Sequence, residues 1–229
     1  MFRPNAVVVL VLSVSLSLAP MYGSPAPVIG TVTSATSARV GATSASVGST
    51  LFGGDFISTE KTGSIQVRAG AARLLLSGAS SASLGERGGI PSATLLSGTA
   101  VFSTANAKAF LLHAAAADIR PKTDEPTVGQ VTYVNEKELR VRSTRGALAI
   151  TVDGETQFVA EGMAYRVILD PDEYMMREAA NQGPEGAGSR RRGGPLRAGR
   201  SRFLLIAIII TSVATGVALY EALQSPDHP

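Results

Sequence analysis

Side chains that could carry chemistry are few in this chain of 229 residues. It has no cysteine, which excludes a disulfide framework, a thiol nucleophile and a thiolate zinc site. Two histidines, His113 and His228, leave little for imidazole-based catalysis or metal binding. Serine is abundant, yet no Gly-x-Ser-x-Gly elbow is present to expose a nucleophile. We therefore expect no catalytic residue, no metal site, no cofactor and no enzymatic activity.

The acidic side chains are better explained by turns than by a site. Asp55 follows Gly53-Gly54, where its carboxylate can hydrogen-bond the backbone of its own turn, so we favour a structural role. Asp118, Asp124 and Glu125 are assigned to a proline-containing loop, but calcium loops need more oxygen ligands at tighter spacing. We expect these loop charges to be solvated.

The charge distribution argues against nucleic acid as a partner. The net charge is +3 and the sequence pI about 9.4, but six arginines between 190 and 202 account for this, and the rest of the chain carries −3. A nucleic-acid-binding domain is expected to spread basic residues over a folded face. Tryptophan is absent and aromatic residues make up 5%, so we expect no base-stacking platform.

The apolar residues concentrate at the two ends and indicate export and membrane attachment. Residues 1–23 place Arg3 before an apolar run, which is typical of a secretory signal peptide. An uncleaved signal anchor is the alternative, because the nearby prolines suit a signal peptidase poorly. Residues 203–220 are uncharged and about long enough for a transmembrane helix, with Tyr220 at an interfacial position. A buried core helix is the alternative there.

The two ends of the chain predict opposite orientations of the protein in the membrane. A signal peptide exports the middle of the chain, whereas the positive-inside rule would keep the Arg190–Arg202 cluster in the cytoplasm. We give the signal priority because it acts first during synthesis. The arginine cluster is then either a solvated linker or a contact for anionic lipid headgroups. The middle of the chain is expected outside the cytoplasm, on a single-pass membrane protein.

Between the ends, residues 28–169 have the pattern of an all-β domain. Short segments alternate polar and apolar residues between turn residues, as in Ser64–Arg68 and Leu148–Val152. Asp153-Gly154, which separates two such segments, predicts a two-residue hairpin. Further strand segments are expected at 28–32, 56–57, 74–76, 95–96, 110–113, 129–134, 139–142 and 156–159.

A short amphipathic helix and a linker are expected after the domain. Asp170 can cap a helix that has Pro171 at its first position and Glu173 completing a capping box, so we predict a helix over 170–182. Residues 183–202 are rich in Gly, Pro and Arg and lack an apolar period, which is typical of a linker.

Residues 28–169 resemble the FecR-like periplasmic domains of bacteria. The segment Leu51–Thr59 is similar to the G-D-x-I-x-T signature of that family, and later glycine turns are similar in order and spacing. Two elements depart from the family pattern: Ala69-Gly70-Ala71 replaces an Asp-Gly-Ser turn, and a Gly-Thr-x-Phe element is not recognisable near 114–120. The positions that carry the resemblance, all expected to be structural, are Gly54, Asp55, Ile57, Thr59, Gly98, Gly146 and Gly162.

The resemblance implies a short-stranded β-sandwich or solenoid-like domain that acts as a non-catalytic sensing or protein-interaction module of the cell envelope. The best-known members hold a sigma factor with a cytoplasmic N-terminal segment, which we do not expect here because few residues precede the first apolar run. The expected partners are an unidentified envelope protein and membrane lipid, the latter through Phe203–Tyr220 and the Arg190–Arg202 cluster. The alternative is a structural scaffold, or a module that attaches to polysaccharide or the cell surface, without a signalling role.

Overall fold

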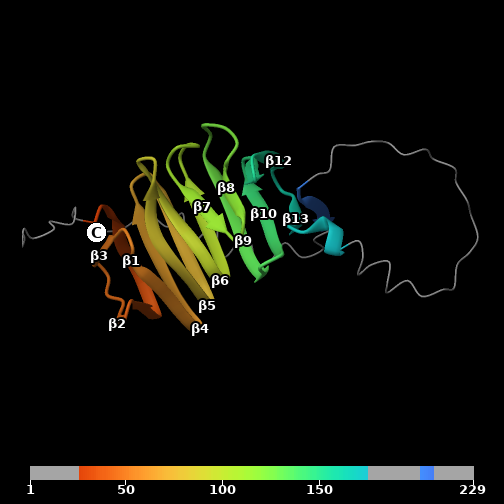
Figure 1. Ribbon diagram of the computed structural model, residues 1–229. Helices are drawn as coiled ribbons and strands as arrows, with labels where there is room; N and C mark the ends of the chain where they lie inside the picture. The colour runs from red at the N-terminus through yellow and green to blue at the C-terminus, as the bar shows by residue number, and fades with distance from the viewer. Residues whose placement is uncertain (1–25, 175–201, 209–229) are drawn as a thin grey trace, which may run out of the picture.

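The computed structural model describes residues 26–174 and 202–208, and most of them lie in β-strands (Figure 1). Residues 171–174 are helical. The strands are β1 Val28–Val40, β2 Thr43–Ser44, β3 Thr50–Phe52, β4 Phe56–Ala69, β5 Ala72–Arg87, β6 Ile90–Thr104, β7 Leu111–Ala114, β8 Ala117–Pro121, β9 Thr127–Asn135, β10 Glu138–Arg145, β11 Leu148–Val152, β12 Glu155–Val159, β13 Ala164–Ile168 and β14 Leu204–Ile208.

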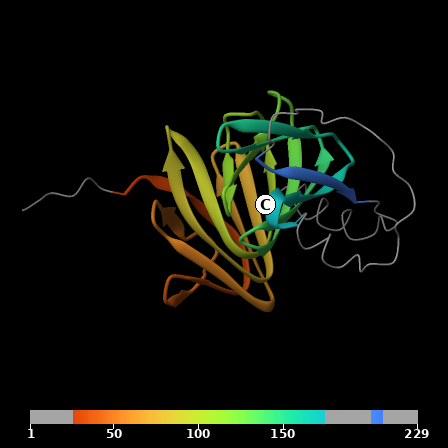
Figure 2. The same ribbon diagram turned by 45° about the vertical axis from the view of Figure 1, so that its right-hand side comes forward.

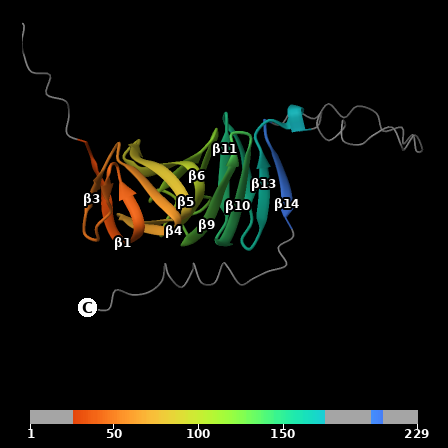
Figure 3. The same ribbon diagram turned by 90° about the horizontal axis from the view of Figure 1, so that it is seen from below.

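All of these strands belong to one hydrogen-bonded sheet, which divides at β6. The first part of β6, Ser92–Leu95, pairs in parallel with β7, whereas Gly98–Thr104 pairs antiparallel with β9. One branch then continues through β7, β8, β11 and β12, and the other through β9, β10, β13 and β14. We call these branches the β12 layer and the β14 layer. Figure 3 shows strands of the β14 layer in a row that ends at β14.

The two layers pack face to face and form a sandwich. Alternate residues of each strand point inward, as expected for a half-buried strand. Side chains from both layers meet in one buried cluster, so a single core lies between them. Its members include Leu112, Ile119, Leu148 and Ile150 from the β12 layer, and Val131, Leu139, Val141 and Val167 from the β14 layer.

At one end the core is closed by strands that cross from layer to layer. Strands β4, β5 and β6 are 14 to 16 residues long, and the two halves of β6 pair with different layers, the first with β7 and the second with β9. Their registers shift between Ser58 and Ser64 and between Ser77 and Ser81, as β-bulges do where a sheet bends. The bend carries each strand from the β12 layer into the β14 layer.

At the other end the core is closed by a segment from far along the chain. Strand β14 pairs antiparallel with β13 and forms the last strand of its layer (Figure 2). Phe203, just before it, is fully buried and belongs to the common core. Its carbonyl accepts a hydrogen bond from Gln157 Nε2 at 3.1 Å, and the backbone N–H of Arg202 donates to Glu155 at 2.7 Å. The segment therefore joins the edge strand β12 to the opposite layer.

The sequence-based prediction of a sandwich-like all-β fold is confirmed. The Asp153-Gly154 hairpin is also present: it connects β11 to β12, and both turn residues have positive φ, as a type I′ turn requires. Several strands are longer than predicted, and β2, β3, β8 and β13 were not anticipated. The missed strands follow turns without the usual Asn-Gly or Asp-Gly signal, such as Ala115-Ala116.

The expected transmembrane helix over 203–220 is wrong for its first residues, because Leu204–Ile208 forms a strand. An apolar run satisfies its backbone equally well by pairing with an open sheet edge, and here β13 supplies that edge. Among the described residues, no helix has the length and apolar character needed to cross a membrane. Residues 209–220, the signal peptide at 1–23, and most of the expected helix and linker lie outside the described residues.

Replacing Phe203 tests how much this closure stabilises the fold. Phe203→Ala removes a fully buried ring from the end of the core and should lower the free energy of unfolding by about 3 kcal/mol. The matched control is Leu204→Ala, whose side chain is 37% exposed and should contribute about 1 kcal/mol or less. Urea unfolding of the full chain measures both, and equal losses would contradict the closing role of Phe203.

Candidate functional site

The signature acid Asp55 holds a turn. Its carboxylate accepts a hydrogen bond from the backbone N–H of Phe52 at 2.8 Å. The same turn is fixed to β5 by two backbone hydrogen bonds with Leu84, one from Gly54 and one to Asp55, both 2.8 Å. The side chain is thus used inside its own turn, and Ile57, two residues on, is fully buried in the core.

Two further signature positions meet at the bend of the long strands. The hydroxyl of Thr59 accepts a hydrogen bond from the backbone N–H of Ser80 at 3.0 Å. Ser80 is fully buried, and its own hydroxyl accepts from the N–H of Thr99 at 2.8 Å. Gly98 has φ +78 and packs so closely on Ser80 that a Cβ would overlap it. Sequence reasoning missed Ser80, whose neighbours Ser77, Ser81 and Ser83 gave it no distinguishing signal.

Gly146 and Gly162 meet at a second structural point. Gly162 donates its N–H to the carbonyl of buried Ser143 at 2.9 Å, and the Ser143 hydroxyl donates to the carbonyl of Gly146. The N–H of Gly146 donates in turn to Glu161 at 3.2 Å. The signature residues therefore lie at separate turns and bends, and the structure does not assemble them into one site.

His113 has a partner that the sequence did not reveal. Asp118 lies in β8 rather than in a loop, and it is the direct cross-strand neighbour of His113 in β7. His113 Nδ1 lies 2.7 Å from Asp118 Oδ1, and Arg87 donates to the same carboxylate at 3.1 Å. The cluster lies on the outer face of the β12 layer, partly exposed. Within the described part, no group of three or more potential metal ligands is found.

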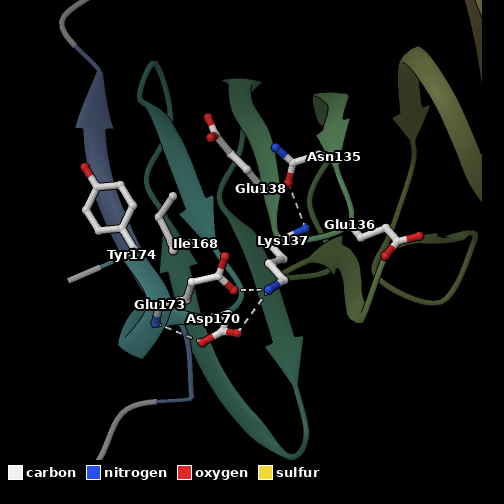
Figure 4. Close-up of a pocket in the computed structure, with 8 residues that line it drawn as sticks. All are labelled: Asn135, Glu136, Lys137, Glu138, Ile168, Asp170, Glu173 and Tyr174. Atoms are coloured by element: carbon white, nitrogen blue, oxygen red, sulfur yellow. Dashed lines mark hydrogen bonds and ion pairs between the residues drawn. The ribbon is translucent and has the colours of Figure 1, made fainter. Parts of the chain in front are cut away.

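Lys137 fixes the start of the helical residues 171–174. It lies beside a pocket of about 380 Å³ between the β9–β10 turn and Tyr174 (Figure 4). The Lys137 ammonium donates to Glu173 and lies 3.6 Å from Asp170, whose carboxylate accepts from the N–H of Glu173 at 3.3 Å. The hydrogen bond to Glu173 raises the pKa of Lys137 above its ordinary value, against a smaller opposing effect of desolvation. These contacts anchor a chain segment and hold no reactive group.

The outer surface of the β14 layer carries a different feature, which we call the arginine face. Its residues alternate with inward side chains, as Arg140 and Arg142 do with Leu139 and Val141. The members are Arg68 of β4, Arg73 of β5, Arg140, Arg142 and Arg145 of β10, and Arg166 of β13. Only Glu138 lies among them as a strand acid, and it is bound to Arg166 by two hydrogen bonds of 2.8 and 3.0 Å.

Like charges lie directly opposite each other on this face. Arg68 is the register partner of Arg73, and Arg140 is the register partner of Arg166. Opposed like charges destabilise a sheet. Arg142 Nε is buried and has no hydrogen-bond partner within the described residues. The described residues contain 14 basic and 14 acidic side chains, so this face is matched by an excess of acid elsewhere on the surface.

The arginines surround apolar and hydroxyl groups. Leu75, Val101 and Val128 form a small buried cluster of their own in the middle of the face. Beside it, a shallow pocket of about 390 Å³ is flanked by Arg73 and Arg145. The hydroxyl residues Ser103, Thr104 and Thr127 also line this pocket, together with Pro126. The face combines cations, hydroxyls and a central apolar patch.

Sequence reasoning treated basicity as a property of the Arg190–Arg202 cluster and missed this face. One sequence pattern could have predicted part of the arginine face. It is the alternation Leu139-Arg-Val-Arg142, which places two arginines on the same side of one strand. The remaining arginines join them only through pairings between distant segments. The reason given for excluding nucleic acid therefore does not hold, because basic residues are in fact spread over a folded face.

No family model and no curated protein matches the sequence. Two crystal structures from Parabacteroides distasonis ATCC 8503, each described provisionally as an anti-sigma factor, are similar at 15% and 14% identity. Each match has a TM-score of 0.42 and covers 49% of this chain and 54% of the other. The chain thus spans about half the length of these neighbours, and the likeness assigns no function to it.

Substitution of Gly98 tests the bend. Gly98→Ala combines a strained positive φ with overlap on buried Ser80, so the free energy of unfolding should fall by more than about 3 kcal/mol. Gly162→Ala has a similar φ of +76 but nothing within 4 Å of the new methyl group, and should lose about 1 kcal/mol. Denaturant unfolding measures the difference. Similar losses in both variants would show that close packing on Ser80 does not matter.

Proposed function

We propose that the protein is an exported, membrane-anchored FecR-like module that has no catalytic role and binds an acidic partner protein of the cell envelope through its arginine face. The observation that supports this most is the pairing of Arg68 with Arg73 and Arg140 with Arg166 on one open sheet surface. Opposed arginines repel each other, and a carboxylate beside them offsets the repulsion, as Glu138 does for Arg166. Carboxylates of a partner would extend this effect to the other arginines of the face.

The composition of the face fits a protein partner. Arginine is enriched at protein interfaces because its planar guanidinium binds carboxylates in two-pronged geometry and also packs on apolar groups. The cluster of Leu75, Val101 and Val128 offers the apolar centre that such interfaces usually have. The identity of the bound partner would then decide whether the module transmits a signal or acts as a structural scaffold.

Export and anchoring rest on the sequence of residues 1–23 and 203–220 and on the FecR resemblance. The acidic partner is then an envelope protein, and the Arg190–Arg202 cluster faces lipid headgroups or solvent. In this arrangement any signal across the membrane passes through the partner.

Binding of a fluorescent polyglutamate peptide tests the arginine face. Replacing Arg68, Arg140 and Arg145 with Gln should weaken binding at least about tenfold, because each lost charge contact contributes roughly 0.5–1 kcal/mol. The matched control replaces Arg39, Arg87 and Arg120, which lie outside the face, and should stay within about twofold of the original protein by the same reasoning.

Two results of this titration would contradict the proposal. Equal weakening in both triple variants would show that only net charge matters. Tighter binding of single-stranded DNA or of a uronic acid oligosaccharide than of the peptide, at the same salt concentration, would assign the face to nucleic acid or polysaccharide. The second assignment corresponds to a surface-attachment module.

A topology reporter tests export. The reporter is an enzyme active only outside the cytoplasm, inserted into the exposed loop at Thr123 so that both ends of the chain stay in place. It should be active in bacterial cells because the signal peptide exports the β domain. The same reporter fused after Pro229 should be inactive if 203–220 spans the membrane. An inactive reporter at Thr123, in a chain that accumulates to normal levels, would place the β domain in the cytoplasm and overturn the proposed location.

A further inference from the structure

We infer that the segment Phe203–Ile208 has two mutually exclusive positions, one as the closing strand of the sandwich and one in a lipid bilayer. The inference rests on the proposed membrane anchoring and adds a consequence to it. When the segment is in lipid, the β13 edge and the site of Phe203 are open. When it is docked, the chain is not anchored by a full-length span.

The docked position uses all of the segment. Five register pairs join β14 to β13, from Ala164 with Ile208 to Ile168 with Leu204. Phe203 fills the end of the core, and Arg202 reaches β12 and its hairpin through Glu155 and through Asp153, whose carboxylate lies 3.5 Å from the guanidinium. None of these contacts can be kept by residues that lie in a bilayer.

The bilayer position needs the same residues. Residues 203–220 form an uncharged stretch of 18 residues, close to the roughly 20 that a membrane helix needs. Docking removes residues 203–208 and leaves 209–220, which as a helix would reach only about 18 Å against a hydrocarbon thickness of about 30 Å. A full span therefore requires that β14 leave β13.

The two positions compete because the docked strand is incompletely buried. Strand β14 has a single neighbour, and its outward residues Leu204 and Ile206 stay partly exposed, with Leu204 at 37%. Lipid would cover the side chains of Leu204 and Ile206 completely. The sandwich offers a different advantage, because it buries Phe203 in a packed protein core. The docked strand leaves apolar surface exposed to water, and a bilayer would remove that surface from water. The presence of a membrane therefore decides between the two positions.

The consequence of undocking is an exposed acceptor edge. Without β14, β13 presents a row of unpaired backbone groups next to an apolar site, which is the arrangement that takes up an added strand. The anchored protein would then offer this edge to an extended apolar segment. The docked protein would keep it covered by its own residues.

A disulfide that locks the docked position tests the inference. The chain has no cysteine, so Ala164→Cys together with Ile208→Cys creates a single pair at register partners on β13 and β14. The control pair is Ser64→Cys with Ser77→Cys, register partners on β4 and β5 that leave β14 free. Each oxidised, monomeric full-length protein is mixed with vesicles of phosphatidylethanolamine and phosphatidylglycerol. Hydrogen exchange of residues 164–168 and flotation with the vesicles are both measured.

We expect vesicles to speed exchange of residues 164–168 at least about tenfold in the original chain and in the control pair, since a tenfold change in opening is a shift of about 1.4 kcal/mol. The locked protein should show no such change until it is reduced. Flotation with unchanged protection of β13 would overturn the inference while leaving anchoring intact. Failure of every variant to float, reduced or oxidised, would overturn the proposed anchoring and the inference with it.

Discussion

A sandwich made from one continuous sheet must have its core covered at both ends, and the rest of this structure depends on that requirement. At one end the long strands β4, β5 and β6 bend from layer to layer, and the buried hydroxyl of Ser80 is satisfied within the bend. At the other end Phe203 and β14 complete the core from a distant part of the chain. One closure is built into consecutive strands, and the other depends on a segment that sequence alone would assign to a membrane.

Closing the core in this way leaves the outer faces of both layers open to solvent. The β12 layer uses its outer face for a compact cluster of His113, Asp118 and Arg87, in which opposite charges meet. The β14 layer instead places Arg68 opposite Arg73, so that like charges meet on its outer face. The charge pattern, rather than a catalytic group, is what distinguishes one surface from the other.

The all-β class and most strand positions could be predicted because alternation of polar and apolar residues is a local property. The turn at Asp153-Gly154 could be predicted for the same reason. The bend at Ser80, the contact of His113 with Asp118 and the arginine face could not, because each depends on which strands become neighbours. The run Leu204–Ile208 is ambiguous in principle, since a bilayer and a sheet edge both accept an uncharged apolar segment, and only the open edge of β13 reveals the second use.

The position of β14 is the point on which this account depends most, and nuclear magnetic resonance of the full chain in lipid-free buffer tests it most directly. We predict cross-strand nuclear Overhauser contacts between backbone protons of Val167 and Leu205 and of Tyr165 and Ala207, which are register partners. Contacts between residues three apart along 203–208, without any contact to β13, would show a helix there and would contradict closure of the sandwich by this segment.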